Sequence, residues 1–194
     1  MADAGRVIAG TARGRRLTAP GDGTRPLADR VKQTLFAILE PDLPGAAFLD
    51  LCAGSGAAGI EALSRGAGRA TFVERDRRAA TTIAENLALT GLSGPSARIV
   101  RAEAAAWLAT DAAAEDGPFD LVVVDPPYAD TDLLRRLLEV LGADADGRLL
   151  KRGGRVVAKH FWRDRPPAST GLLASERDRR FGETGLTFYR REGG

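Results

Sequence analysis

The stretch Phe119-Asp120-Leu121-Val122-Val123-Val124-Asp125-Pro126-Pro127-Tyr128 combines a strand pattern with an abrupt, polar end. Its apolar run, residues 121–124, is typical of a strand buried on both faces of a parallel sheet. The strand must stop at the two prolines, because proline has a fixed φ and no N–H to donate. We therefore predict a buried strand that ends at a carboxylate, a Pro-Pro turn and an aromatic ring.

The residues after this strand suit a planar ring that carries an amine. The Asp125 carboxylate and the Pro126 carbonyl are neighbouring acceptors with few local donors to occupy them. Pro127 and then Tyr128 follow, and the tyrosine offers a flat face for stacking. Acceptors beside such a face match the exocyclic amine of a nucleobase. On this motif alone, a plain strand end followed by a Pro-Pro turn stays open as an alternative.

Strand and helix patterns alternate on both sides of this stretch. We expect strands at residues 48–51, 71–73, 98–100, 119–124 and 154–158, and a hairpin over 172–190 around Gly182-Glu183. Helices should end near Leu39, Arg65, Thr90, Leu108 and Leu141. This alternation predicts an α/β fold with a doubly wound, mostly parallel sheet of seven strands, finished by an antiparallel C-terminal hairpin.

The first 44 residues read as a separate, basic extension. Two short strands within residues 6–19 should flank a turn at Arg13–Arg16, and a helix should span about residues 27–39. The predicted domains are therefore 1–44, a β-hairpin plus helix, and 45–194, the α/β domain. No internal repeat interrupts either part.

Charge is distributed unevenly along the chain. Residues 1–32 carry seven Arg/Lys against three acids, residues 33–147 nine against eighteen, and residues 148–191 twelve against four. Basic ends around an acidic middle indicate contact with a polyanion, and nucleic acid is the expected one. Solvated arginines on an Arg-rich chain are the alternative.

The sequence contains very little cysteine and histidine, which limits the kinds of site and fold that the protein can have. Cys52 and His160 are the single cysteine and the single histidine, so neither an internal disulfide nor a metal cluster is expected. His160 is interpreted as a residue near a strand end. No apolar run approaches the ~20 residues of a membrane span. These features predict a cytoplasmic protein.

A glycine-rich turn between the first strand and its helix points to a cofactor. The sequence Gly54-Ser55-Gly56-Ala57-Ala58-Gly59 is a G-x-G-x-x-G motif, and Glu74 stands twenty residues after Gly54. Such a loop lets the backbone approach an anion at a helix N-terminus, while the acid accepts both ribose hydroxyls of an adenosine. A dinucleotide fits this pattern, and S-adenosylmethionine fits equally well, with Asp50 near its ammonium group. A glycine-rich turn without a ligand is the third possibility.

The fourth strand favours S-adenosylmethionine. In a doubly wound sheet this strand neighbours the first across the topological switch point, so Asp125 should lie near the glycine loop. A dehydrogenase needs a proton donor there, and none of the usual residues is present. A methyltransferase needs acceptors for an amine, and these are present.

Taken together, the motifs closely resemble the bacterial 16S rRNA (guanine-N2)-methyltransferases of the D type. The stretches that carry the resemblance extend over nearly the whole chain: Arg6–Gly10, Gly14–Leu17, Thr24–Pro26, Asp29–Lys32, Leu35-Phe36, Asp50–Gly56, Glu61–Ala67, Asp125–Tyr128 and Phe181–Thr184. Two positions depart from the family pattern. Glu103 replaces a usual Asp but should still reach an adenine amino group, and Lys159 stands where an acid is common, so no role is carried onto it.

The resemblance implies a class I methyltransferase fold that uses S-adenosyl-L-methionine to methylate the N2 amine of one guanine in 16S rRNA. The implied substrate form is an assembled or partly assembled small ribosomal subunit. The candidate residues fall into a catalytic, a cofactor-binding and an RNA-binding set: Asp125, Pro126, Pro127 and Tyr128; Asp50, Ala53, Gly54, Ser55, Gly56, Glu74, Arg75, Glu103 and Ala104; and Arg13, Arg15, Arg16, Arg25, Arg30 and Lys32. An adenine-N6 methyltransferase, a nicotinamide oxidoreductase and a non-catalytic RNA-binding assembly factor are the alternatives.

Overall fold

The computed structural model describes residues 3–21 and 27–193. The chain forms two compact units, Met1–Glu103 and Ala104–Gly194. The N-terminal hairpin and helix thus belong to the same unit as the glycine loop. The division between residues 44 and 45 stays a prediction.

The first unit contains the N-terminal segment and the first three strands of the α/β pattern. Its elements are β1 (Asp3–Arg6), β2 (Arg16–Thr18), α1 (Asp29–Leu39), the 3-10 helix η1 (Glu40–Asp42), β3 (Ala47–Leu51), α2 (Ala57–Ser64), β4 (Arg69–Val73), α3 (Arg77–Thr90) and β5 (Ala97–Val100). The first strand of the N-terminal hairpin lies earlier than predicted, because its pairing with β2 begins at Asp3.

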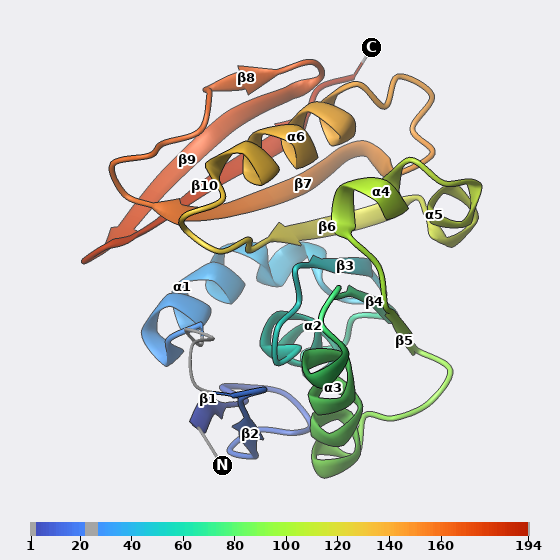
Figure 1. The fold of residues 1–194 in the computed structure, drawn as a ribbon, viewed down its shortest axis with the longest axis vertical. Helices are drawn as coiled ribbons and strands as arrows, with labels where there is room; N and C mark the ends of the chain where they lie inside the picture. The colour runs from blue at the N-terminus through green and yellow to red at the C-terminus, as the bar shows by residue number, and fades with distance from the viewer. Residues whose placement is uncertain (1–2, 22–26, 194) are drawn as a thin grey trace. The chain divides into compact units, whose positions relative to one another are not determined.

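The strands of the first unit form a parallel sheet in the order β5-β4-β3 (Figure 1). Helix α2 packs on β3 and β4, and all eight of its residues are buried. A side chain at Gly59 would bring its Cβ within 2.2 Å of the Phe72 ring. The third glycine of the motif is therefore required by close packing of helix against strand.

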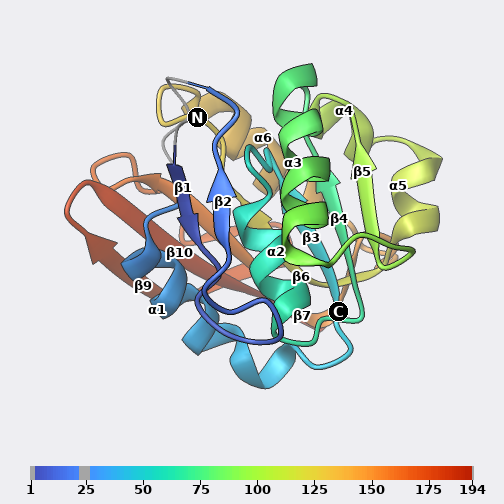
Figure 2. The same ribbon diagram turned by 90° about the horizontal axis from the view of Figure 1, so that it is seen from below.

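Local signals set the limits of α3 as the sequence predicts. The Asp76 carboxylate accepts a hydrogen bond of 2.9 Å from the Ala79 amide at the helix N-terminus. Gly91 ends the helix with a left-handed φ of 73°. Strand β2 runs beside this helix (Figure 2).

The second unit contains the remaining strands and helices. Its elements are α4 (Ala104–Leu108), α5 (Asp111–Asp116), β6 (Phe119–Val124), α6 (Thr131–Gly142), β7 (Leu150–Phe161), β8 (Ser169–Thr170), β9 (Leu173–Phe181) and β10 (Thr184–Arg191). Helix α5 and the two-residue strand β8 are additions to the predicted pattern, so β8 is one strand more than the seven expected.

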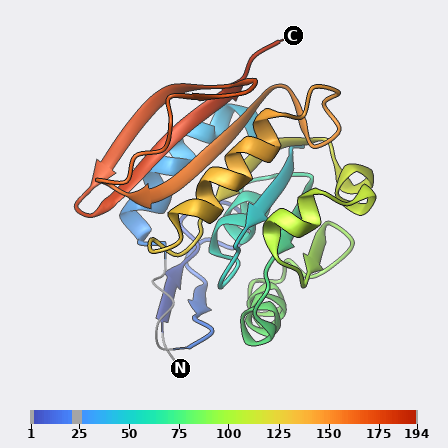
Figure 3. The same cartoon turned by 45° about the horizontal axis from the view of Figure 1, so that its top comes forward.

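In the second unit, β6 and β7 are parallel and the following strands are antiparallel, in the order β6-β7-β10-β9-β8. Helix α6 lies across β7 and the strands of the hairpin (Figures 1 and 3). Its buried face consists of the leucines predicted for it: Leu133, Leu134, Leu137, Leu138 and Leu141. The predicted α/β fold with an antiparallel C-terminal hairpin is confirmed.

Two negative observations apply to the described residues. None of their helices has the length and apolar character needed to cross a bilayer. Nor do these residues bring together three or more His, Cys, Asp or Glu side chains in a group that could hold a metal ion.

Candidate functional site

The glycine loop of the first unit adopts the backbone conformation that its sequence predicts. Between β3 and α2, Gly54 and Gly56 have φ values of 57° and 77°, in the left-handed region that glycine enters without strain. Cys52 also has a positive φ, 61°, which is uncommon for a residue with a side chain. Strain of this kind concentrates at ligand-binding loops, so the loop is a sound candidate for anion or cofactor contact.

Two buried carboxylates hold this loop in place. Glu74, at the end of β4, accepts hydrogen bonds from the amides of Gly54 (2.8 Å) and Asp76 (2.9 Å). Asp50, in β3, accepts one from the Gly59 amide at 2.9 Å. Glu74 therefore fixes the backbone of the loop, and Asp50 fixes the first turn of the helix that follows it.

The other predicted cofactor residues lie in varied surroundings. Ala53 and Ser55 are buried within the loop, and Arg75 is exposed just after Glu74. Glu103 is half-buried at the end of the first unit, whereas Ala104 is buried in α4 at the start of the second. Their contacts with a cofactor stay a prediction.

The predicted RNA-binding arginines lie at the surface where the structure describes them. Arg13, Arg15, Arg16 and Arg30 are exposed, and Arg25 falls outside the described residues. Arg16 also pairs with Asp3 at 3.2 Å, an exposed ion pair of little energetic weight.

Lys32 departs from the prediction. Its side chain is fully buried, and its ammonium group donates a 2.6 Å hydrogen bond to the Arg6 carbonyl and lies 3.7 Å from Asp29. Burial lowers the Lys32 pKa, while Glu61 and Asp29 oppose that shift. Lys32 thus joins α1 to the N-terminal strand and is withdrawn from the proposed RNA surface.

Residues that the sequence analysis assigned no role fasten the N-terminal segment to the glycine-loop helices. The fully buried Glu61 accepts hydrogen bonds from the amides of Ile8 (2.7 Å) and Ala9 (3.0 Å). Asn86, on α3, donates to the carbonyls of Thr18 and Ser55, both at 2.9 Å. One side chain thus joins the arginine-bearing hairpin to the glycine loop.

The Asp-Pro-Pro-Tyr motif of the second unit follows β6 directly. Asp125 Oδ1 accepts a 2.5 Å hydrogen bond from Lys159 Nζ, and the two side chains are 22% and 9% exposed. Strand register places them together, because Val124 lies opposite Ala158. Burial raises the Asp125 pKa, and the Lys159 ammonium opposes this shift by favouring the carboxylate.

This pair corrects one expectation. The acceptors after β6 were expected to have few local donors, but Lys159 occupies one oxygen of Asp125. Asp125 Oδ2 and the buried Pro126, with its carbonyl, remain as acceptors, and Pro127 is exposed. The departure from the family pattern at position 159 was the available signal, because Lys159 directly follows the predicted strand 154–158 and could pair with an acid at the end of a neighbouring strand.

The hydroxyl of Tyr128 is hydrogen-bonded, and its ring contacts a cation. The hydroxyl forms a 2.7 Å hydrogen bond with Thr184 Oγ1 on β10. Lys159 Nζ lies 5.0 Å from the ring centroid, within the range of a cation–π contact. Thr184 belongs to a stretch that carried the family resemblance, although no role was predicted for it.

His160 has a structural role, as expected for a residue near a strand end. Its ring nitrogens lie 2.8 Å from the Phe161 carbonyl oxygen and 3.0 Å from Thr187 Oγ1. Burial lowers the His160 pKa, which favours the neutral ring.

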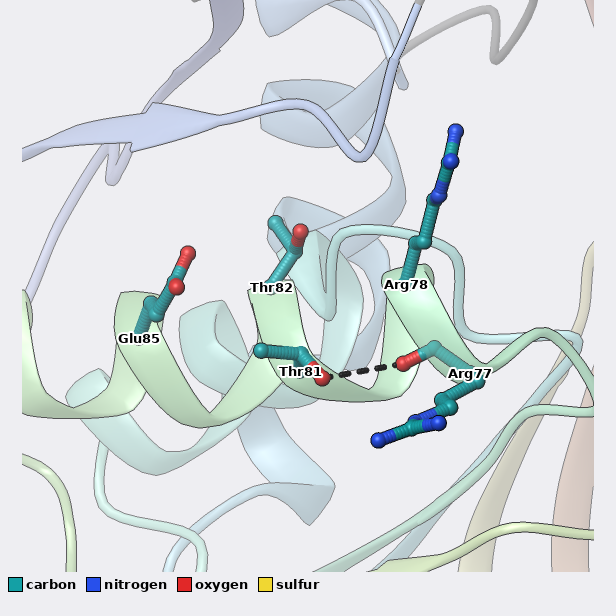
Figure 4. A pocket seen from close by; sticks show the side chains of 5 residues that line it. All are labelled: Arg77, Arg78, Thr81, Thr82 and Glu85. Atoms are coloured by element: carbon teal, nitrogen blue, oxygen red, sulfur yellow. Dashed lines mark hydrogen bonds between the residues drawn. The ribbon is translucent and has the colours of Figure 1, made fainter.

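A separate pocket lies along α3. This open pocket of about 410 Å³ is lined by Arg77, Arg78, Thr81, Thr82 and Glu85. Arg78, Thr82 and Glu85 project from one side of the helix, and the Thr81 hydroxyl donates to the Arg77 carbonyl (Figure 4). The pocket contains none of the predicted site residues.

Comparison with known proteins adds family membership to this geometry. A family model described as Conserved hypothetical protein 95 matches residues 5–190. The chain belongs to this family. The Bacillus subtilis protein YlbH, named provisionally as an rRNA methyltransferase, is 38% identical over 97% of this chain and 100% of its own length. The family resemblance drawn from the sequence motifs is therefore confirmed.

Two further relatives agree with this membership. The Escherichia coli protein named Ribosomal RNA small subunit methyltransferase D is 44% identical over 63% of this chain, a match that spans 60% of that protein. The solved structure of Escherichia coli yhhF, provisionally described as a methyltransferase, superimposes with a TM-score of 0.83 at 34% identity. It covers 97% of this chain and 98% of its own.

Proposed function

We propose that this protein transfers a methyl group from S-adenosylmethionine to the exocyclic N2 amine of a guanine in small-subunit rRNA. The observation that carries the proposal is the buried Asp125–Lys159 pair, which fixes a carboxylate beside Tyr128 in a family whose named relatives are rRNA methyltransferases. The assignment of guanine N2 rests on the motif resemblance.

The residues of the glycine loop fit the cofactor. The left-handed glycines let the backbone turn tightly into the N-terminus of α2, where an anionic carboxylate is favoured. Glu74 stands at the end of the neighbouring strand, as an acceptor for ribose hydroxyls requires. S-adenosylmethionine supplies an electrophilic methyl on a sulfonium when it is bound.

The chain's own residues then activate the amine. The guanine amine is a weak nucleophile, since its lone pair is delocalised into the ring. Asp125 Oδ2 and the Pro126 carbonyl would accept its two hydrogens, which favours a pyramidal nitrogen and stabilises the positive charge that develops on it as it accepts the methyl group. The nitrogen then loses one of these protons to solvent, which leaves the neutral N2-methylguanine. Tyr128 stacks on the base and sets its angle of approach.

Lys159 holds the acceptor in its active form. Burial raises the Asp125 pKa, and the ammonium group opposes this shift because it favours the carboxylate. It also fixes the carboxylate by its bond to Oδ1, so that Oδ2 faces the amine. A preorganised acceptor of this kind needs no reorganisation during the reaction.

We further propose that the exposed arginines of the N-terminal segment, Arg13, Arg15, Arg16 and Arg30, contact rRNA phosphates. The base must be unpaired and turned out of any stack to reach Tyr128, and folded rRNA offers such bases in loops. An assembled or partly assembled small subunit is the substrate that presents this folded form.

The test is a labelling reaction with small subunits from a strain that lacks the protein. After incubation with the enzyme and methyl-labelled S-adenosylmethionine, the RNA is digested and the labelled nucleoside is identified. N2-methylguanosine is expected, and free 16S rRNA in a parallel reaction separates the two substrate forms. Labelled N6-methyladenosine or N4-methylcytidine would overturn the choice of guanine, and no label in RNA would overturn the function.

A further inference from the structure

Three aromatic rings form a continuous row that begins at the proposed catalytic tyrosine. The centroids of Tyr128 and Phe161 are 6.3 Å apart, and those of Phe161 and Trp162 are 6.2 Å apart. Both pairs are tilted by 51°. All three residues belong to the second unit, and the row runs from the end of β6 to the end of β7.

Cationic groups accompany the row. The Arg180 guanidinium lies 3.6 Å from the centroid of the Trp162 ring, and that of Arg163 lies 4.8 Å from it. Both arginines are exposed. Arg180 is also held by a 3.0 Å hydrogen bond from its Nε to the Gly182 carbonyl in the hairpin turn. Guanidinium planes are thus fixed over an aromatic face at the surface.

The surroundings of the row differ from those of core aromatics. Phe161 and Trp162 are each half-buried, whereas the other tryptophan, Trp107, is 5% exposed. A purely structural cluster would gain most by complete burial of such large rings. The row is therefore partly open to solvent, and the two exposed arginines over Trp162 present guanidinium planes to a ligand.

We propose that the row of Tyr128, Phe161 and Trp162, with Arg163 and Arg180, is a stacking platform for the unpaired nucleotides that flank the target guanine. The proposal rests on the proposed function, because it places the target base at Tyr128. Unpaired bases stack on aromatic rings and on arginine planes without regard to sequence, and the arginines also meet the phosphates. Duplex RNA is excluded, because its base faces are already stacked within the helix.

The platform is tested by the fluorescence of Trp162. The Trp107→Phe variant leaves Trp162 as the single tryptophan reporter, since the chain contains two. Titration with a short single-stranded RNA should quench this signal in a saturable way, and the same sequence in a duplex should not. Quenching by the duplex at equal affinity, or none by the single strand, would overturn the inference.

Substitutions then measure how much Trp162 and Arg180 each contribute to RNA binding. The variants at Trp162 lack the fluorescent reporter, so their binding is measured by the fluorescence anisotropy of a dye-labelled single strand. Trp162→Ala should weaken binding by about 5- to 150-fold, as expected when one base loses its stacking partner, whereas Trp162→Phe should retain most of the affinity. Arg180→Gln should lower the salt slope of binding by about 0.7. Arg152→Gln is the matched control, because this exposed arginine lies toward the opposite end of β7 and its loss changes the net charge equally.

Two variants distinguish a failure of the stacking platform from a failure of the proposed function. Asp125→Ala should keep oligonucleotide binding and lose methylation, while Trp162→Ala should raise the KM for small subunits and leave cofactor affinity unchanged. Equal oligonucleotide affinity and KM in the wild-type and Trp162→Ala proteins would refute the platform alone. Methylation retained by Asp125→Ala would instead refute the proposed mechanism and leave the platform standing.

Discussion

Replacement of Asp125 by alanine has two consequences that the structure separates. The first is chemical: one preorganised electrostatic contact to the target amine disappears. Removal of such a contact costs about 2.7–4 kcal/mol of transition-state stabilisation, or roughly 100- to 1,000-fold in rate. Cofactor affinity should be nearly unchanged, because the proposed partner of Asp125 is the amine. Single-turnover methylation and calorimetric titration with S-adenosylmethionine measure the two quantities.

The second consequence is structural. The Lys159 side chain is only 9% exposed, so Asp125→Ala leaves a buried ammonium group without its anion. Breaking a buried pair in this way costs about 3–5 kcal/mol of folding free energy. The double variant Asp125→Ala/Lys159→Met should regain stability in thermal or chemical unfolding while remaining inactive.

A matched pair on the same strand provides the control. Asp120 bonds Lys151 at 2.7 Å, with the two side chains 28% and 47% exposed. Asp120→Ala should therefore cost no more than about 1 kcal/mol of stability and leave methylation intact. The reasoning is refuted if Asp125→Ala keeps turnover within about tenfold of wild type, or if the double variant recovers methylation.

Substitutions at Glu74, at Lys159 and at the pair Arg13 and Arg15 test the remaining assignments. Glu74→Ala should weaken S-adenosylmethionine binding in calorimetry, because the ribose loses its charged acceptor and the glycine loop its anchor; an unchanged dissociation constant would place the ribose acid elsewhere. Lys159→Met should raise the Asp125 pKa further, so the acidic limb of the methylation pH profile moves to higher pH and activity returns as pH rises. Lys159→Arg should restore the wild-type profile, and an unmoved limb in the methionine variant would contradict the role of the ammonium. Arg13→Gln with Arg15→Gln should flatten the salt dependence of RNA binding by about 0.7–0.9 for each phosphate that is no longer neutralised, and equal slopes would assign these arginines to solvent.

Local patterns in the sequence were sufficient for most of the fold. Apolar residues repeat with different periods in strands and in helices. The run at residues 121–124 and the leucines of α6 could therefore be predicted as buried. The cap at Asp76 and the stop at Gly91 are equally local, since each acts within one turn of α3. These features could be predicted because neighbouring residues determine them.

The errors concern interactions between residues far apart in the chain. Lys32 was interpreted as a surface cation, but the Arg6 carbonyl, 26 positions away, accepts its ammonium hydrogen bond. Lys159 meets Asp125 across 34 positions. Helical and strand periodicity describe one element at a time. They therefore could not predict that the N-terminal strand buries Lys32 of α1, or which residues of β6 and β7 lie opposite one another.

The proposed methylation of guanine N2 in small-subunit rRNA through Asp125 can be measured in cells. The most direct measurement is nucleoside mass spectrometry of 16S rRNA from cells that lack the gene, carry it, or carry the Asp125→Ala form. N2-methylguanosine should be lost on deletion, restored by the wild-type gene and not restored by the variant at equal protein level. An unchanged amount of N2-methylguanosine in all three strains would contradict the proposal.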